Sequence, residues 1–358
     1  FIGKNLVARL RETGRDVAAL TRQTTAEQLS DELGNADFVF HLAGVNRPQS
    51  DAEFNVGNVD YTRALCAALA SKQNTAPLVY ASSIQATAEN AYGRSKRAAE
   101  DVVFEHAKSV ESRAYVMRLP NVFGKWCRPN YNSAVATFCH QLARGLPIKI
   151  NDPNAALRLV YIDDLVERLL ALLTASLPSG FVEVAPIYET TVGEVVAILQ
   201  SFEDGRKTLV TPRVGTGLVR ALYSTYVSYL PPERFTYDVP RHSDPRGVFV
   251  EMLKTPDCGQ FSYFTAGPGI TRGEHYHHTK TERFLVIHGT ARFQFRHILT
   301  GEAHEVTLRG GEGRIVESIP GWTHNVTNVG DDELIVMLWA SEIFDRARPD
   351  TVPMKVAL

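Results

Sequence analysis

Histidines gather in one short part of this sequence. Seven of the eleven histidines lie between His275 and His324, whereas histidines with separate structural roles would be spread along the chain. His275 and His277 stand two residues apart, so on a β-strand their side chains would project to the same face. Imidazoles brought together in this way are typical ligands of a transition metal. A metal-free sugar-binding site that uses them as hydrogen-bond donors or bases is the alternative.

A second group of residues could support reduction of a ketone. A hydride delivered to a carbonyl carbon leaves negative charge on oxygen, so a proton donor must lie there. A tyrosine, with an ordinary pKa of about 10, serves if a cation lowers that value. Tyr92 and Lys96 would share one helix face, and Ser83 would bind the same oxygen. An isolated Tyr-x-x-x-Lys would as readily be a surface pair.

The first half of the chain alternates short apolar runs with helical patterns, as a parallel sheet covered by helices requires. This pattern predicts a Rossmann-type α/β domain. The expected strands are Val17–Leu20, Phe38–Leu42, Leu78–Ser82 and Ala114–Leu119, and the expected helices include Val59–Ser71 and Tyr92–Ala107.

The pattern changes after a stretch rich in proline and turn-forming residues, between Leu230 and Gly247. Beyond it, runs such as Ala291–Phe295 alternate with period two, and glycine-rich turns recur. These features predict an all-β sandwich or barrel. We therefore expect two domains, residues 1–238 and 239–358.

Composition limits the possible partners. The 38 Lys and Arg residues nearly balance the 40 Asp and Glu residues, so neither nucleic acid nor an anionic membrane is expected as the main partner, and small molecules are. The four cysteines show no C-x-x-C pairing, which favours free thiols and a cytoplasmic location. The sequence shows no signal-peptide pattern and no apolar run of the roughly 18 residues that span a bilayer. It begins at Phe1, and an N-terminal strand is expected to be missing.

Several motifs, in order, resemble the extended short-chain dehydrogenase/reductase family. Gly3 corresponds to the last glycine of its nucleotide-binding turn, and His41-Leu42-Ala43-Gly44 to a turn beside the adenine ribose. Tyr92 and Lys96 fit its Tyr-x-x-x-Lys signature. Within Arg118–Gly124, the resemblance places Leu119, Asn121 and Val122 along the nicotinamide. The family's proton donor and its helpers would then be Tyr92, Lys96 and Ser83.

The choice between NADH and NADPH depends on the residue after the second strand. An acid there binds the ribose hydroxyls, whereas an arginine accommodates a 2′-phosphate. Arg22 follows the expected strand Val17–Leu20, and the first carboxylate comes only at Glu27. We therefore expect NADPH, although Arg22 could be an ordinary solvated side chain.

The histidine-rich stretch resembles the first motif of the cupin family, G-x5-H-x-H-x4-E-x6-G. It runs from Gly269 to Gly289 and includes His275, His277 and Glu282. Pro320–His324 resembles the second motif, with its leading glycine one residue out of register. The resemblance implies a metal site of His275, His277, Glu282 and His324, for zinc or for iron, manganese or nickel.

A short-chain reductase followed by a cupin resembles the bifunctional UDP-sugar enzymes of the CapF or WbjC type, which serve capsule and O-antigen synthesis. The resemblance implies C3 epimerisation of a UDP-2-acetamido-2,6-dideoxy-4-hexulose in the cupin domain and NADPH-dependent C4 reduction in the first domain. It implies a homodimer and leaves the epimerising base open, with Lys280, His288 and His297 as candidates.

Two other functions remain to be weighed. One is a reductase or dehydratase whose cupin only binds sugar or builds the oligomer. The other is an NADP-sensing binding protein, which would not need the intact Ser83, Tyr92 and Lys96.

Overall fold

The chain forms two compact units. The computed structural model describes residues 1–21 and 23–357. One unit comprises Phe1–Leu199 and Ala221–Leu230, and the other comprises Gln200–Arg220 and Pro231–Leu358. Among the described residues, no helix combines the length and the apolar character needed to cross a membrane.

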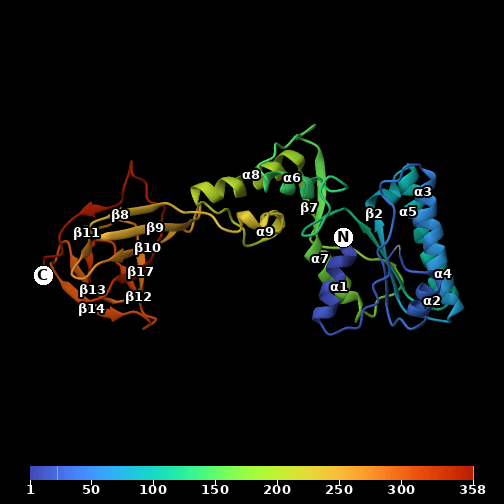
Figure 1. The fold of residues 1–358 in the computed structure, drawn as a ribbon, viewed down its shortest axis with the longest axis horizontal. Helices are drawn as coiled ribbons and strands as arrows, with labels where there is room; N and C mark the ends of the chain where they lie inside the picture. Colours follow the sequence, from blue (N-terminus) through green and yellow to red (C-terminus); the bar gives the residue numbers. More distant parts are fainter. Residues whose placement is uncertain (22, 358) are drawn as a thin grey trace. The chain divides into compact units, whose positions relative to one another are not determined.

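A parallel sheet forms the centre of the first unit (Figure 1). Its strands, in spatial order, are β1 (Val39–His41), β2 (Leu78–Ser83), β3 (Ala114–Leu119) and β6 (Gly180–Phe181). Almost every residue of β2 and β3 is buried, as expected for strands covered on both faces. The Rossmann-type α/β prediction is therefore confirmed.

Helices surround this sheet, and α4 and α5 pack together on it. The α-helices in the described residues are α1 (Ile2–Glu12), α2 (Ala26–Gly34), α3 (Ala52–Phe54), α4 (Tyr61–Ser71), α5 (Ala91–Ser109), α6 (Ala134–Leu142), α7 (Ile162–Leu172), α8 (Val192–Thr208) and α9 (Gly217–Val227). A smaller sheet joins β4 (Asn121–Phe123), β5 (Ala156–Tyr161) and β7 (Tyr188–Thr191).

The prediction of a strand at Val17–Leu20 is wrong. These residues have no regular secondary structure, because no strand among the described residues pairs with them. The Leu20 side chain nevertheless packs against the buried core that α4, α5 and the parallel sheet share. Its apolar character therefore reflects burial and not strand pairing.

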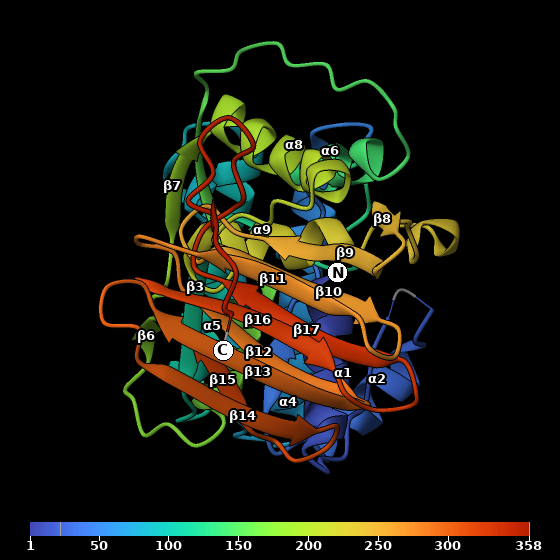
Figure 2. The same ribbon diagram turned by 90° about the vertical axis from the view of Figure 1, so that its left-hand side faces the viewer.

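Two antiparallel sheets form most of the second unit, and their strands run side by side in Figure 2. The first sheet has the order β15 (Ile315–Ser318), β12 (Glu282–His288), β17 (Leu334–Ala340), β10 (Gln260–Ala266), β9 (Gly247–Lys254) and β8 (Arg241–Asp244). The second has the order β14 (Ala303–Arg309), β13 (Thr290–His297), β16 (Trp322–Asn328), β11 (Thr271–Tyr276) and β18 (Val352–Pro353). The prediction of an all-β cupin-type domain is confirmed.

The inner faces of these sheets meet in an apolar core. Ala291, Phe293 and Phe295 alternate with less buried residues along β13, as their period-two pattern predicted. They pack with Phe284 of β12 and Val336 of β17, which belong to the opposite sheet. The core thus joins the strands that carry the histidine-rich motifs.

Gly289 forms the tight turn between β12 and β13. Its φ is +80°, and a Cβ at this position would lie 3.0 Å from Glu333 O and 3.0 Å from Leu334 Cα. The turn therefore requires both the left-handed backbone and the absence of a side chain.

We expect Gly289→Ala to lower the free energy of unfolding of the second unit by about 1–3 kcal/mol. The matched control is Gly301→Ala, because Gly301 has a similar φ of +73° but open space around its Cβ position. Urea unfolding followed by tryptophan fluorescence would measure the free energy of unfolding of both variants, since Trp322 and Trp339 lie in this unit. Equal losses in the two variants would show that the contact with β17 contributes nothing.

Candidate functional site

A close approach of backbone brings Ser83 and Tyr92 together. Ser83 ends β2, and Tyr92 lies in the first turn of α5, which Asn90 caps by accepting a bond from Gly93 N at 2.7 Å. A Cβ on Gly93 would lie only 2.3 Å from Gln85 O and 2.4 Å from Ala88 O. Glycine is therefore required for the helix to begin against the turn that follows β2.

The Ser83 side chain lies close enough to the Tyr92 phenol to act on its pKa, as the expected sharing of one substrate oxygen requires. Burial raises the pKa of the Tyr92 phenol, and the nearby Ser83 hydroxyl opposes part of this rise. The phenol is thus protonated at neutral pH and can act as a proton donor. Phe54 packs beside it, with ring centroids 5.4 Å apart.

Lys96 lies one turn further along α5 but does not act directly on Tyr92 in this structure. Its ammonium donates to Tyr80 Oη at 3.1 Å and to Ala81 O at 2.9 Å. The expected lowering of the Tyr92 pKa by Lys96 is therefore not observed, because the cation is directed to β2. Burial lowers the pKa of Lys96 to about 8, and the negative charge of Glu100 opposes this shift.

The turn after β1 adjoins Lys96. A Cβ on Gly44 would lie 3.2 Å from Lys96 Nζ and 3.0 Å from Asn58 Oδ1. The preceding residues of the turn are Leu42, half-buried, and Ala43, exposed. His41 is buried and bonded to Thr62 Oγ1 at 2.8 Å, and burial together with the charge of Lys96 lowers its pKa to about 3. His41 is therefore neutral at pH 7.

The remaining residues predicted to bind cofactor are more dispersed. Leu119 ends β3 and is buried, whereas Asn121 and Val122 begin β4 and are exposed and half-buried. Gly3 lies in the first turn of α1, with open space around its Cβ position. Arg22 lies outside the described residues.

Sequence reasoning missed a buried charge that links these segments. Glu100, only 2% exposed, accepts two bonds from Arg118 Nε and one from Arg118 Nη2, between 2.6 and 3.2 Å. Ser82 Oγ donates to the same carboxylate at 2.5 Å. Ser82 precedes Ser83, and Arg118 precedes Leu119, so Glu100 fixes both strand ends against α5. Glu100 follows Lys96 by four residues, and residues at this spacing share one face of a helix. The sequence could therefore have placed Glu100 beside Lys96.

Asn58 is a second residue that sequence reasoning missed. Its side chain exchanges hydrogen bonds with the backbone of Val45, at 2.8 and 3.0 Å, and donates to Ser95 Oγ at 3.0 Å. It therefore holds the turn after β1 against α5. No local pattern in the sequence indicates this bridge.

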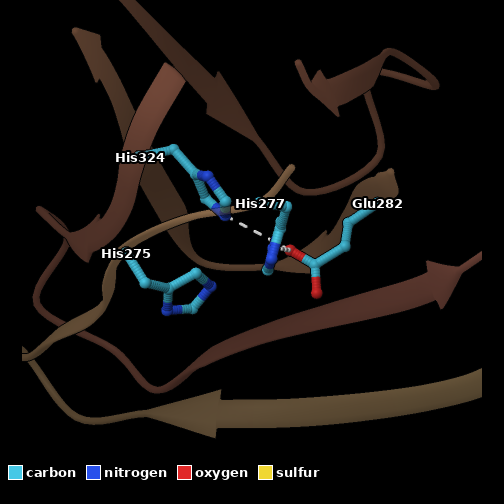
Figure 3. Close-up of side chains that lie close together, drawn as sticks. All are labelled: His275, His277, Glu282 and His324. Carbon is cyan, nitrogen blue, oxygen red and sulfur yellow. Dashed lines mark hydrogen bonds and ion pairs between the residues drawn. The ribbon is translucent and has the colours of Figure 1, made fainter. Parts of the chain in front are cut away.

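The second unit brings together all four residues predicted to bind metal. His275 lies in β11, His277 directly follows that strand, Glu282 begins β12 and His324 lies in β16. One possible ligand atom from each lies within 4.8 Å of those of the others. Figure 3 shows the three imidazoles and the carboxylate converging. His278, which follows, is exposed, and its ring packs against Tyr276.

The hydrogen bonds of His277 leave room for a cation. Nδ1 of His277 lies 2.5 Å from Asp350 O, and a carbonyl oxygen only accepts, so Nδ1 carries the proton. Nε2 of a neutral His277 then presents a lone pair to Glu282 Oε2, 3.1 Å away. His324 Nε2 approaches the same oxygen at 3.2 Å. A lone pair on nitrogen and a carboxylate oxygen repel each other unless a second proton or a metal ion lies between them. Three imidazoles and one carboxylate are a donor set that fits a divalent transition metal.

The electrostatics of the cluster agree with this fit. Burial alone would raise the pKa of Glu282, but the close approach of His277 and His324 and the charge of Lys280 hold it below its usual range. Burial, followed by the charge of His324, lowers the pKa of His275 to about 4. At pH 7 the cluster thus offers an ionised carboxylate and a neutral His275 imidazole, the forms that bind metals.

A cavity of about 250 Å³ adjoins the cluster. His275, Glu282, His324 and Lys280 form part of its polar wall, and phenylalanines such as Phe264 and Phe284 form much of its apolar wall. Lys280 is buried, and its ammonium lies 3.7 Å from Glu282 Oε1.

The other two histidines considered as epimerising bases lie elsewhere. His288 is exposed at the end of β12. His297 ends β13, and its ring packs against Trp322, with centroids 5.2 Å apart. Lys280 is thus the candidate that lines the cavity.

Comparison with known proteins gives matches over both units. Residues 1–185 match the NAD dependent epimerase/dehydratase family, and residues 242–352 match the polysaccharide biosynthesis C-terminal domain. The chain is 54% identical to a UDP-2-acetamido-2,6-beta-L-arabino-hexul-4-ose reductase from Pseudomonas aeruginosa, over 99% of this chain and 96% of that protein.

Solved structures agree with these matches. The capsular polysaccharide assembling protein CapF from Staphylococcus aureus superposes with a TM-score of 0.93 at 41% identity, over 99% of this chain and 97% of that one. A UDP-glucose 4-epimerase from Thermotoga maritima, 17% identical with a TM-score of 0.54 over 64% of this chain and 95% of that one, shares the fold alone. The chain therefore belongs to the NAD dependent epimerase/dehydratase family and, within it, to the CapF-type proteins that carry a polysaccharide biosynthesis C-terminal domain.

Proposed function

We propose that this protein is a bifunctional nucleotide-sugar enzyme. It epimerises C3 of a UDP-2-acetamido-2,6-dideoxy-4-hexulose and then reduces the C4 ketone, giving UDP-2-acetamido-2,6-dideoxy-L-talose. The observation that carries the proposal is that one chain holds the neighbouring Ser83 and Tyr92 side chains and a cavity that adjoins a cluster of three histidines and one carboxylate. The name of the Pseudomonas aeruginosa relative, a reductase of a UDP-linked hexul-4-ose, supports the choice of substrate.

We assign reduction to residues 1–238 and epimerisation to residues 239–358. The proposed enzyme is a cytoplasmic homodimer that serves capsule or O-antigen synthesis. The match of the second unit to a polysaccharide biosynthesis domain supports this pathway.

The residues around Lys96 fit a nicotinamide cofactor. Its buried ammonium has three N–H donors but two hydrogen-bond acceptors among the described residues, Tyr80 Oη and Ala81 O, so one donor is available for a ribose hydroxyl. Gly44 keeps the space beside this ammonium free of a side chain. Bound NADPH, the cofactor expected from Arg22, would supply the hydride.

The protein's own part in reduction is to hold and protonate the carbonyl oxygen. Ser83 would donate a hydrogen bond to the C4 oxygen, and Tyr92 would transfer its phenolic proton to that oxygen as hydride reaches C4. The buried positive charge of Lys96, one helical turn from Tyr92, would stabilise the resulting phenolate through space and not by a direct hydrogen bond. The chain thus supplies one proton for each hydride, and an alcohol forms.

The second site fits a divalent metal, and we propose zinc held by His275, His277, Glu282 and His324. Bound there, the ion would supply Lewis acidity to a ketone oxygen, which makes the neighbouring C3–H more acidic. The apolar walls of the cavity lower the local dielectric and strengthen the effect of the Lys280 charge on the same substrate. Proton removal and return on opposite faces of C3 would complete the epimerisation.

Tyr92→Phe should lower the rate of NADPH oxidation with the 4-hexulose by about 10²–10⁴-fold, since it removes the proton donor. Exchange of the C3 proton with deuterated water, followed by NMR without NADPH, should stay at the parent rate. Equal rates of NADPH oxidation in the variant and the parent would refute the role of Tyr92.

His277→Ala should abolish the C3 exchange, because it removes one ligand and the partner of Asp350 O. The variant should still oxidise NADPH with the ketone and should contain less zinc by elemental analysis. His288→Ala, at an exposed histidine of the same unit, is the matched control and should behave as the parent. Exchange at C3 that persists in His277→Ala would favour the alternative of a reductase whose cupin domain only binds sugar or builds the oligomer.

Glu100→Gln should shift the basic limb of the kcat/KM profile for ketone reduction to lower pH. The Glu100 charge raises the pKa of Lys96, which stands at about 8, so its removal makes Lys96 lose its proton at lower pH. The matched control is Glu105→Gln, at an exposed position of the same helix. A profile between pH 6 and 10 that coincides with that of the parent would contradict this electrostatic coupling.

A further inference from the structure

The last part of the chain, residues 350–356, packs along the metal-binding cluster. Within it, β18 pairs with β11, so that Pro353 lies opposite His275 and Val352 lies opposite Tyr276. We call residues 350–356 the C-terminal segment. The metal-binding cluster includes none of these residues. The segment nevertheless contacts His277 and the residues next to His275 and His324.

The Asp350 carboxylate holds the loop between His277 and Glu282. Oδ1 accepts a hydrogen bond from His278 N at 2.8 Å. Oδ2 accepts bonds from Thr279 N at 2.7 Å, Thr279 Oγ1 at 2.9 Å and Lys280 N at 2.8 Å. One carboxylate thus fixes three consecutive backbone amides. Because these amides lie between His277 and Glu282, the carboxylate sets the distance between the two metal ligands.

The backbone of the same residue acts on His277 itself. Asp350 O accepts the Nδ1 proton of His277 at 2.5 Å, so the imidazole is held with Nε2 directed at Glu282. Metal-binding histidines commonly depend on such a partner to fix the tautomer and the ring orientation. The carboxylate therefore places the carbonyl that orients the ligand.

Other bonds tie the C-terminal segment to the remaining histidines. Glu274, next to His275, accepts from Met354 N at 2.9 Å through its carbonyl and from Val356 N at 2.7 Å through its carboxylate. Thr323, next to His324, donates to Met354 O at 2.5 Å. The segment thereby fixes the relative positions of β11 and β16.

We propose that Asp350 is a positioning residue of the metal site, which acts through the 278–280 loop and through His277. The inference rests on the metal site proposed above. Thr351 extends the effect to the cavity, since its Oγ1 accepts from the Lys280 ammonium at 3.2 Å. Loss of the carboxylate should loosen the ligand geometry while the four ligands themselves remain.

Asp350→Asn tests the proposal in the full-length protein. The amide group replaces one acceptor by a donor that faces N–H groups, so we expect about 10–100-fold weaker zinc binding in competition with a chromogenic chelator. The visible absorption bands of the cobalt-substituted variant should also change, because they report ligand geometry. Thr279→Val removes one bond to Asp350 and should weaken zinc binding by a smaller factor, which keeps the test decisive if Asp350→Asn does not fold.

Asp345→Asn is the matched control. The Asp345 carboxylate lies in the chain shortly before the segment, but among the described residues it bonds only within its own turn, to Ala347 N at 2.8 Å and Arg348 Nε at 3.5 Å. It should leave zinc affinity and the cobalt spectrum unchanged. Parent-like zinc affinity and cobalt bands in folded Asp350→Asn, or parent-like affinity in Thr279→Val if Asp350→Asn does not fold, would overturn the inference. A parent protein that binds no metal would instead overturn the proposed metal site.

Discussion

The second unit depends on how a buried negative charge is balanced. Glu282 is only 7% exposed, so its carboxylate needs N–H donors or cations in place of water. His277, His324 and Lys280 surround it, from the loop after β11, from β16 and from the residues before β12, and a proton or a metal ion between the imidazoles and the carboxylate completes the balance. These segments belong to both sheets and their connections, so the charge is balanced only when the sheets close over their phenylalanine-rich core. Folding of the unit and assembly of the site are therefore the same event.

The first unit also contains buried charges that must be paired, here two opposite charges on one helix. Lys96 and Glu100 are both buried, four residues apart on α5, and each is matched by groups on the parallel sheet. The lysine reaches Tyr80 and Ala81 of β2, while Glu100 binds Arg118 of β3. Because a misplaced helix would leave both charges unpaired, this network fixes the position of α5 along the sheet. The position of Tyr92 relative to Ser83 follows from it.

Local sequence patterns predicted what depends on local structure. Period-two alternation located β13, continuous apolar runs located β2 and β3, and motif spacing identified the histidine cluster. Patterns failed where a distant partner decides the outcome. Residues 17–20 have the composition of a strand, but no strand in the described part of the chain pairs with them. The Lys96 ammonium is bound by Tyr80, sixteen residues before it. Asp350 lies 72 residues beyond His278, whose amide it binds, and no local pattern could connect them.

The pairing of these two sites in one chain has a chemical reason in the proposed reaction. A proton at C3 is acidic only while C4 is a ketone, so epimerisation must precede reduction. Epimerisation is reversible and leaves a mixture, whereas hydride transfer removes the ketone and with it the acidity of C3. The reductase step therefore draws the mixture toward one configuration and prevents its return. The order of the steps then follows from the substrate's chemistry and needs no direct contact between the two sites, which explains how each unit can be complete in its own residues.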